Sequence, residues 1–418
     1  LESPFFTILI RSITALYFFN AFAADTAASG NLCKANTTFT LDLFKSLGGK
    51  DKTSNVFFSP LSISSALSML LLGAKGSTAK QMREVEVYYV CTMYSLCLPY
   101  LVLPQCLKTK DCKDVHSSFA ALLQELNKPD SSYLSRVENI FTYHTAKFLE
   151  ETRKFYNAEL ESVDFLNKAE EARNQINSWV EEQTQGKIKD LLVRDAVDSS
   201  SKLVLVNAIY LKADWKEQFE KDFTRDAVFR LNKRETRTVK MMWHKSKFKL
   251  RHVKEVIELP YKRGELSMLI FLPNDIEDNT TGLEKLEKQL TCETFMEWTR
   301  PDKMDLHQVE LKLPRFRVEE NYELSEVLKH MGMEDAFAQT RCDFSGEENL
   351  MLSKAVHKAF VDVNEAGTEA GAATFVLMAL GSSKGPQASF IADHPFLFFI
   401  RHNATRAVLF AGRFCSEK

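Results

Sequence analysis

Serine and histidine side chains could do covalent chemistry in this chain, but they stand in no complete catalytic pattern. The segment Gly381-Ser-Ser-Lys-Gly385 matches Gly-x-Ser-x-Gly, the motif that places a serine nucleophile on a strand-to-helix turn. Pro386 follows at once and no helical pattern succeeds it, so we interpret the match as chance. The zinc motif His-Glu-x-x-His and a glycine-rich phosphate loop are absent from the sequence. We therefore expect a protein that is not an enzyme and holds no metal or cofactor.

Eight cysteines are the other reactive side chains. They are Cys33, Cys91, Cys97, Cys106, Cys112, Cys292, Cys342 and Cys415. No Cys-x-x-Cys pair occurs among them, so a zinc site is not expected. Reduced thiols in a cytoplasmic protein are the simplest interpretation, with the extracellular space as a second location.

A run of small residues near the C-terminus, from Glu365 to Thr374, is the most informative stretch of the sequence. At the period of two that a strand would impose, one face would carry Thr368, Ala370, Ala372, Thr374, Val376 and Met378. The opposite face would carry Glu369, Gly371, Ala373, Phe375, Leu377 and Ala379. The first face bears no charge, so this segment could enter a sheet and lie beneath helices. A flexible Gly/Ala linker is the other interpretation of the run taken alone.

Periodicity and capping residues predict the elements that would position this run. Ser59 followed by Pro60 indicates the start of a helix, and Gly73 indicates its end. Lys202–Leu211 is nearly unbroken apolar sequence, which is typical of a strand buried on both faces. Further expected elements are helices at Ala169–Thr184 and Tyr322–Met331, and buried strands at Phe396–Ile400 and Ala407–Phe410. Helices and strands mix irregularly, which predicts an α+β fold.

Bulk composition is that of one folded protein without a strong global field. The chain of 418 residues is 45% hydrophobic and 26% charged, and 54 basic against 56 acidic side chains give a net charge of −2. We therefore expect neither nucleic acid nor a membrane as partner. A local basic cluster, which we interpret as a solvated strand face with polyanion binding as the minor option, comprises Lys240, Lys245, Lys247, Lys249, Arg251 and Lys254.

Two segments stand apart from the rest of the chain. Residues 1–30 include an apolar stretch and the sequence Ala21-Phe22-Ala23, which resembles a signal-peptidase site. Either a signal-like segment or a gene-model artefact would explain them, and we favour the artefact. Residues 86–112 form an apolar insertion in which Pro99 and Pro104 argue against a membrane span. We favour a retained intron or a gene-model error as the origin of this insertion, with a functional loop as the alternative.

Five separated blocks of the sequence resemble the serpin family, in the family's order. They are residues 55–64 (NVFFSPLSIS), 205–215 (LVNAIYLKADW), 311–317 (LKLPRFR), 352–364 (LSKAVHKAFVDVN) and 390–400 (FIADHPFLFFI). The resemblance extends from about Asn36 to Phe414, and the chain's ending is most similar to the ovalbumin-type, clade B serpins. It implies a single domain over residues 31–418, with three β-sheets, about nine helices and an exposed reactive-centre loop at about residues 365–390. The insertion at 86–112 would then fall in the loop between the family's third and fourth helices.

The resemblance also implies a function, the inhibition of serine proteases by a suicide-substrate mechanism. A protease would cleave the loop at Gly381-Ser382 or, as a rival site, at Leu380-Gly381, and the loop would then insert into the main sheet. The hinge that enters first would consist of Glu365, Gly367, Thr368, Glu369, Ala370, Gly371, Ala372, Ala373 and Thr374. Expected partners are elastase-like, cathepsin G-like or chymotrypsin-like serine proteases and, as a further class, papain-like cysteine cathepsins. We expect a monomer.

Two further residue groups carry over from the family by match. Ser59, Ser62, Asn207 and His357 would form the shutter, a buried hydrogen-bond cluster beneath the point where the sheet parts. Arg315, Trp215 and Glu365 would lie in the breach at the top of the sheet, with an ion pair between Arg315 and Glu365. The hinge contains no large or charged residue on its inward face, which favours an inhibitor. A non-inhibitory binding or carrier protein is the alternative.

Overall fold

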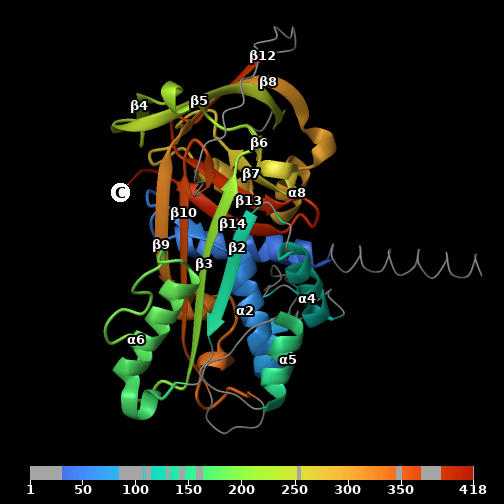
Figure 1. Cartoon of the computed structure of the whole chain (residues 1–418), viewed down its shortest axis with the longest axis vertical. Helices are drawn as coiled ribbons and strands as arrows, with labels where there is room; N and C mark the ends of the chain where they lie inside the picture. Colours follow the sequence, from blue (N-terminus) through green and yellow to red (C-terminus); the bar gives the residue numbers. More distant parts are fainter. Residues whose placement is uncertain are drawn as a thin grey trace, which may run out of the picture.

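The computed structural model of the chain describes residues 31–417, apart from 84–106, 108, 110–113, 129–130, 132, 141–145, 157–162, 252–255, 345–350 and 369–386 (Figure 1). Nine α-helices lie in this described part. They are residues 31–48, α2 (Pro60–Gly73), α3 (Gly76–Arg83), α4 (Val115–Leu126), α5 (Ala146–Tyr156), α6 (Phe165–Gln183), α7 (Glu284–Gln289), α8 (Cys292–Trp298) and α9 (Ser325–His330). The insertion predicted at residues 86–112 and the segment 1–30 fall almost entirely outside the described residues.

The described strands form two hydrogen-bonded sheets. A five-stranded sheet has the order β2 (Tyr133–Ile140), β3 (Leu203–Asp214), β11 (Gly367–Thr368), β10 (Leu352–Val363) and β9 (Phe316–Glu323). A nine-stranded sheet has the order β1 (Val56–Phe58), β14 (Val408–Phe414), β13 (Phe396–His402), β7 (Leu266–Phe271), β6 (Val256–Pro260), β5 (Thr236–Arg251), β8 (Asp305–Pro314) and β12 (Gln387–Ile391), with β4 (Arg225–Arg230) beside β5.

The expected α+β class is confirmed, and the long strand β5 explains why two sheets are counted where three were expected. β5 pairs with β8 over ten residues but with β6 only at Lys249–Arg251. Two groups of strands therefore share one hydrogen-bonded network through the end of β5. Figure 1 shows β4, β5, β8 and β12 at the top of the molecule, above β6, β7, β13 and β14.

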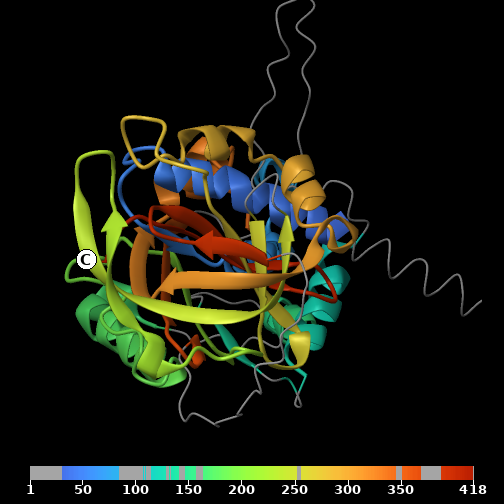
Figure 2. The same ribbon diagram turned by 90° about the horizontal axis from the view of Figure 1, so that it is seen from above.

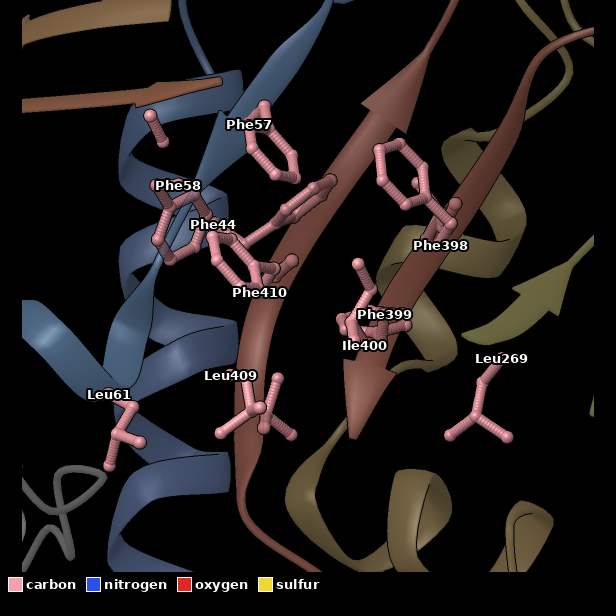
Figure 3. Packing of buried hydrophobic residues seen from close by; sticks show 14 of the residues in the cluster. Phe44, Phe57, Phe58, Leu61, Leu269, Phe398, Phe399, Ile400, Leu409 and Phe410 are labelled. Carbon is pink, nitrogen blue, oxygen red and sulfur yellow. The ribbon is translucent and has the colours of Figure 1, made fainter. Parts of the chain in front are cut away.

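The centre of the molecule is an apolar core between helix α2 and the paired strands β13 and β14. α2 begins where predicted, with the Ser59 side chain accepting a hydrogen bond from the backbone N–H of Ser62 and Pro60 in the first turn. Phe57 stacks on Phe410 with ring centroids 5.4 Å apart and on Phe398 at 5.8 Å (Figure 3). The predicted closing pair of strands is thus confirmed as antiparallel β13 and β14.

Strand β3 is mostly apolar from Leu203 to Leu211, with Asn207 as the exception, because both of its faces are covered. Leu205 and Ile209 face the central core, whereas Val204 and Val206 face a second cluster that includes residues of α6. The same second cluster contains Val356 and Phe360 of the neighbouring strand β10. Helix α6 therefore packs across both β3 and β10.

The loop that follows α6 adds polar contacts to the same strand. Lys354 and Lys358 of β10 donate hydrogen bonds to the backbone carbonyl oxygens of Ala196 and Lys189, both at 2.9 Å. Asn177 of α6 holds this loop by exchanging two hydrogen bonds with the backbone of Leu192. α6 and its loop are consequently fastened to β10 by side chains as well as by apolar packing.

The predicted helix at Tyr322–Met331 is shorter than expected at its start. Tyr322 and Glu323 end strand β9, and α9 begins only at Ser325. Two contacts hold Tyr322 in the strand: it lies opposite His357 in β10, and its hydroxyl accepts a hydrogen bond from the backbone N–H of Phe57 at 3.1 Å. Long-range pairing therefore overrides the local helical pattern here.

Candidate functional site

The first residues of the small-residue run already lie inside the five-stranded sheet. After β10 the chain turns at Asn364–Ala366, and Gly367 and Thr368 return as the short strand β11 between β3 and β10. β11 is antiparallel to both neighbours, with Thr368 opposite Ala213 of β3 and opposite Val363 of β10. The hinge residues from Glu369 to Thr374 and the proposed cleavage positions Leu380, Gly381 and Ser382 lie outside the described residues.

Below β11 the same two strands pair directly with each other. Eight residue pairs, from Leu352 opposite Leu203 to Phe360 opposite Tyr210, form a parallel ladder between β10 and β3. The sheet is thus open to a new strand only at its top, by the length of Gly367–Thr368. Any deeper entry of the hinge would have to separate this ladder.

Gly367 must be a glycine in this arrangement. Its φ of +157° lies at the edge of the region that residues with a side chain rarely adopt. A Cβ atom there would also lie 2.2 Å from the carbonyl oxygen of Ala213 and 2.7 Å from the Cα of Asp214, both of which are backbone atoms. The close approach of β11 to β3 therefore depends on the missing side chain.

Thr368 is fully buried, and its hydroxyl meets a buried tyrosine. The Oγ1 of Thr368 lies 2.8 Å from the hydroxyl of Tyr261, so each hydroxyl has a hydrogen-bond partner. Burial raises the pKa of Tyr261 well above its ordinary value. The Tyr261 ring stacks on Trp215 with centroids 4.4 Å apart. Tyr261 thus links Trp215 to Thr368 of β11, a role that the sequence did not indicate.

The segment after β3 holds the turn between β10 and β11. The indole N–H of Trp215 donates to the carbonyl oxygen of Asn364 at 3.0 Å, and its backbone N–H donates to that of Ala366 at 2.9 Å. The backbone N–H of Phe219 donates to the carbonyl oxygen of Glu365 at 2.9 Å. Trp215 therefore lies at the top of the sheet and fixes the turn that precedes β11.

The ion pair expected between Arg315 and Glu365 is not formed. The buried carboxylate of Glu365 instead accepts a hydrogen bond from the hydroxyl of Thr224 at 2.8 Å. The side chain of Arg315 is exposed to solvent, and among the described residues no carboxylate pairs with it. This part of the breach prediction was wrong, because a neutral hydroxyl from the segment after β3 takes the place of the guanidinium.

The four shutter residues meet beneath β11, where the parallel ladder joins β3 to β10. All four side chains are buried. The backbone N–H of Ser59 donates to Nε2 of His357 at 3.1 Å, so the imidazole proton must sit on Nδ1. That Nδ1–H donates to Oδ1 of Asn207 at 2.6 Å, and the hydroxyl of Ser62 donates to the same oxygen at 2.7 Å. The cluster therefore ties β3 and β10 to the first turn of α2.

Desolvation keeps His357 neutral in this cluster. Burial lowers the pKa of its imidazole from 6.5 to about 3. A neutral ring fits the geometry, because Nε2 accepts and only Nδ1 donates. Asn207 and His357 lie directly opposite each other in the β3–β10 ladder. A strand that entered between β3 and β10 would therefore separate this pair and break its hydrogen bond.

Other chemistry that the sequence raised finds no support in the described part of the chain. No group of three or more His, Cys, Asp and Glu side chains there could hold a metal ion. The cysteines described, Cys33, Cys292, Cys342 and Cys415, are thiols. A search of the described helices found none long and apolar enough to cross a bilayer.

A family model described as "Serpin (serine protease inhibitor)" matches residues 34–417. The chain belongs to the serpin family. It is 48% identical over 397 residues to leukocyte elastase inhibitor from Equus caballus, covering 92% of this chain and 99% of that protein. It is also 47% identical over 398 residues to human Serpin B8, with the same coverage of each chain. The clade B resemblance and the assignment to inhibitors rather than enzymes are thereby confirmed.

Solved serpin structures confirm the fold. A crystal structure of maspin matches with a TM-score of 0.81 at 33% identity, covering 93% of this chain and all of that one. Uncleaved ovalbumin matches with a TM-score of 0.78 at 33% identity, over 92% of this chain and 99% of that one. The chain therefore has the serpin fold.

Proposed function

We propose that this serpin traps serine proteases as a suicide substrate. The protease's serine would attack the carbonyl carbon of Gly381, or of Leu380 in the rival register, and expel the amine of the next residue. The inhibitor would remain joined to the protease as an acyl-enzyme. The observation that carries the proposal is β11, because the loop's first two residues already occupy the top of the slot between β3 and β10 in the antiparallel direction.

The ladder beneath β11 gives the energy of insertion. A strand that continued from β11 would replace one parallel ladder of eight residue pairs by two antiparallel ladders of similar length. The net gain is about eight backbone hydrogen bonds, each contributing about 1 kcal/mol, before apolar burial is added. That is on the order of 10 kcal/mol and comparable to the whole stability of an ordinary domain. It is enough to distort a protease pressed against the far end of the sheet.

The length of the loop sets how far insertion would move the attached protease. Gly381 lies thirteen positions after Thr368, and at about 3.3 Å per residue this stretch spans roughly 43 Å. The acylated protease would be carried that far along the sheet. Hydrolysis of the acyl-enzyme needs an intact oxyanion hole, so distortion of the protease would leave the ester bond uncleaved.

The residues at the scissile bond suggest the targets. Leu380 in the primary pocket would suit chymotrypsin-like or cathepsin G-like proteases, and Gly381 would suit an elastase-like one. Relatives named leukocyte elastase inhibitor support an elastase-like target. Papain-like cysteine proteases read the residue before the scissile one, so Leu380 would also serve them, and we include them as a second class.

Formation of a covalent adduct tests the proposal. The protein is mixed with elastase, chymotrypsin or cathepsin L, and the mixture is denatured in SDS and separated by electrophoresis. We expect a band at the summed mass with at least one serine protease, and none when the protease's serine has been blocked beforehand. Cleavage of the loop without an adduct, for all three proteases, would instead indicate the non-inhibitory binding protein.

A further inference from the structure

A cationic and apolar face lies next to the C-terminal end of the reactive loop, and the proposed mechanism does not use it. The loop ends where β12 begins, at Gln387, and β12 runs parallel to β8 with Gln387 opposite Gln308. Gln308 in turn lies opposite Lys247 of β5. Strands are spaced about 4.8 Å apart, so the Cα of Lys247 is roughly 10 Å from that of Gln387. Figure 2 looks down on β5 and β8, which run side by side.

The face consists of the outward residues of β5 and β8, and it presents two lysines and a leucine. Along β5, Phe248 and Leu250 are buried while Lys245 and Lys247 are exposed, as expected of a strand with one covered face. Leu306 of β8, two residues from Gln308, exposes 62% of its surface. Leu306 lies opposite Lys249 of β5, so it places an apolar side chain on the same face as Lys245 and Lys247.

Neither lysine forms an ion pair within the described residues, although Glu310 lies opposite Lys245 on β8 and interacts with it electrostatically at longer range. Their neighbours on the same face have carboxylates close by: Lys249 lies 3.6 Å from Glu258, and Lys312 lies 3.4 Å from Glu310. Among the described residues no carboxylate lies within ion-pair distance of Lys245 or Lys247. The face therefore carries a net positive charge at the end nearest the loop.

The short segment between the reactive bond and β12 would place a bound protease beside this face. Gln387 lies five positions after Ser382, so a protease bound at the reactive bond would be held within about 18 Å of β12. A domain of about 200 residues has a radius of gyration of roughly 16 Å and is therefore roughly 40 Å across. A protease seated on the loop is thus large enough and near enough to reach Lys247 and Leu306.

We propose that Lys245, Lys247 and Leu306 form an exosite that contacts the body of the target protease and favours proteases with an acidic surface beside the active-site cleft. This inference rests on the proposed function and specifies its partner. Complementary charge raises association rates more than it changes the later steps. The exosite should therefore act on encounter and leave loop insertion unchanged.

Rates of inhibition test the exosite. The double variant Lys245→Glu/Lys247→Glu is compared with the wild type against serine proteases whose cleft surfaces range from acidic to basic. We expect the second-order rate to fall about tenfold for acidic proteases at about 0.05 M salt and the difference to shrink at about 0.5 M. Basic proteases should react as fast or faster. The single variant Leu306→Ser should lower the rate at both salt concentrations.

The control is Lys45→Glu/Lys50→Glu, which makes the same change in net charge with two exposed lysines at the N-terminal helix. It should keep the wild-type rate, and all variants should keep the wild-type stoichiometry of inhibition. Equal rates for the two double variants with every protease would overturn the exosite. So would loss of heparin retention in Lys245→Glu/Lys247→Glu at unchanged protease rates, because the face would then serve a sulfated polyanion.

The same variants separate this inference from the proposed function. If the wild type is cleaved without forming an adduct, the trapping mechanism fails, but kcat/KM for loop cleavage still reports docking. A tenfold loss of kcat/KM in Lys245→Glu/Lys247→Glu alone would then support the exosite. Unchanged kcat/KM would refute it.

Discussion

Thr368→Arg should convert this serpin from an inhibitor into a substrate. Thr368 is fully buried with its hydroxyl on Tyr261, so an arginine side chain has no space or partner in the slot. In the uncleaved protein the arginine can escape by releasing the two residues of β11. After cleavage, insertion has to begin at this position, so the cost of burying the guanidinium falls on the insertion step.

The magnitude follows from that burial. A buried charge that lacks a partner costs several kcal/mol, and a rise of about 3 kcal/mol in the insertion barrier slows insertion by roughly 150-fold. Hydrolysis of the acyl-enzyme is untouched, because the protease is not yet distorted. The number of inhibitor molecules consumed per protease should therefore rise from about one to well above ten.

Titration of a fixed amount of chymotrypsin or elastase measures this number, and electrophoresis shows whether the chain is cleaved or coupled. Thr368→Ser is the matched control, because it retains the hydroxyl for Tyr261 and should behave as the wild type. A stable adduct formed by Thr368→Arg at a ratio near one to one would refute the reasoning that insertion starts with this residue.

Three further expectations concern the same region. Gly367→Ala should lower the melting temperature in calorimetry by several °C, because its Cβ would clash with the backbone of Ala213. The control Gly186→Ala, at a φ of +74° with no atom within 4 Å, should lower the melting temperature less. Equal losses for the two variants would contradict the steric argument. The imidazole of His357 binds a proton below pH 6.5 in the unfolded state but only near pH 3 in the folded state. The free energy of unfolding should therefore decrease as the pH falls from 6.5 to about 3, by up to about 1.4 kcal/mol per pH unit. Urea titrations of His357→Gln should lack this contribution to the slope. Nicking the chain between Leu380 and Ser382 should raise the melting temperature by on the order of 10 °C, and an unchanged value would exclude insertion.

Local patterns in the sequence predicted most of the elements around the site. The Ser59-Pro60 helix start follows from capping and fixed φ, and β3 follows from its nearly unbroken apolar run, because both signals are local. The shutter was placed by resemblance alone, since Ser59 and His357 are far apart in sequence and no local pattern indicates that they meet.

The position of β11 could not be read from the sequence. Small side chains at Gly367 and Thr368 permit entry into a sheet, but the degree of entry depends on contacts from Trp215 and Tyr261. Tyr261 carries no signal that distinguishes it from any other tyrosine in a strand. The wrong ion pair of Arg315 has the same origin, because the competing hydroxyl of Thr224 is contributed by a different segment.

The packing of helix α6 affects the lifetime of the uncleaved protein. Under the proposed mechanism, loop insertion would release about 10 kcal/mol, so the uncleaved protein would need a barrier that prevents insertion before cleavage. α6 rests on both strands that must part, and Lys354 and Lys358 fasten its loop to one of them. Under that mechanism, the rate of insertion without cleavage would depend on a helix at the surface, where temperature, crowding and neighbouring proteins can act on it.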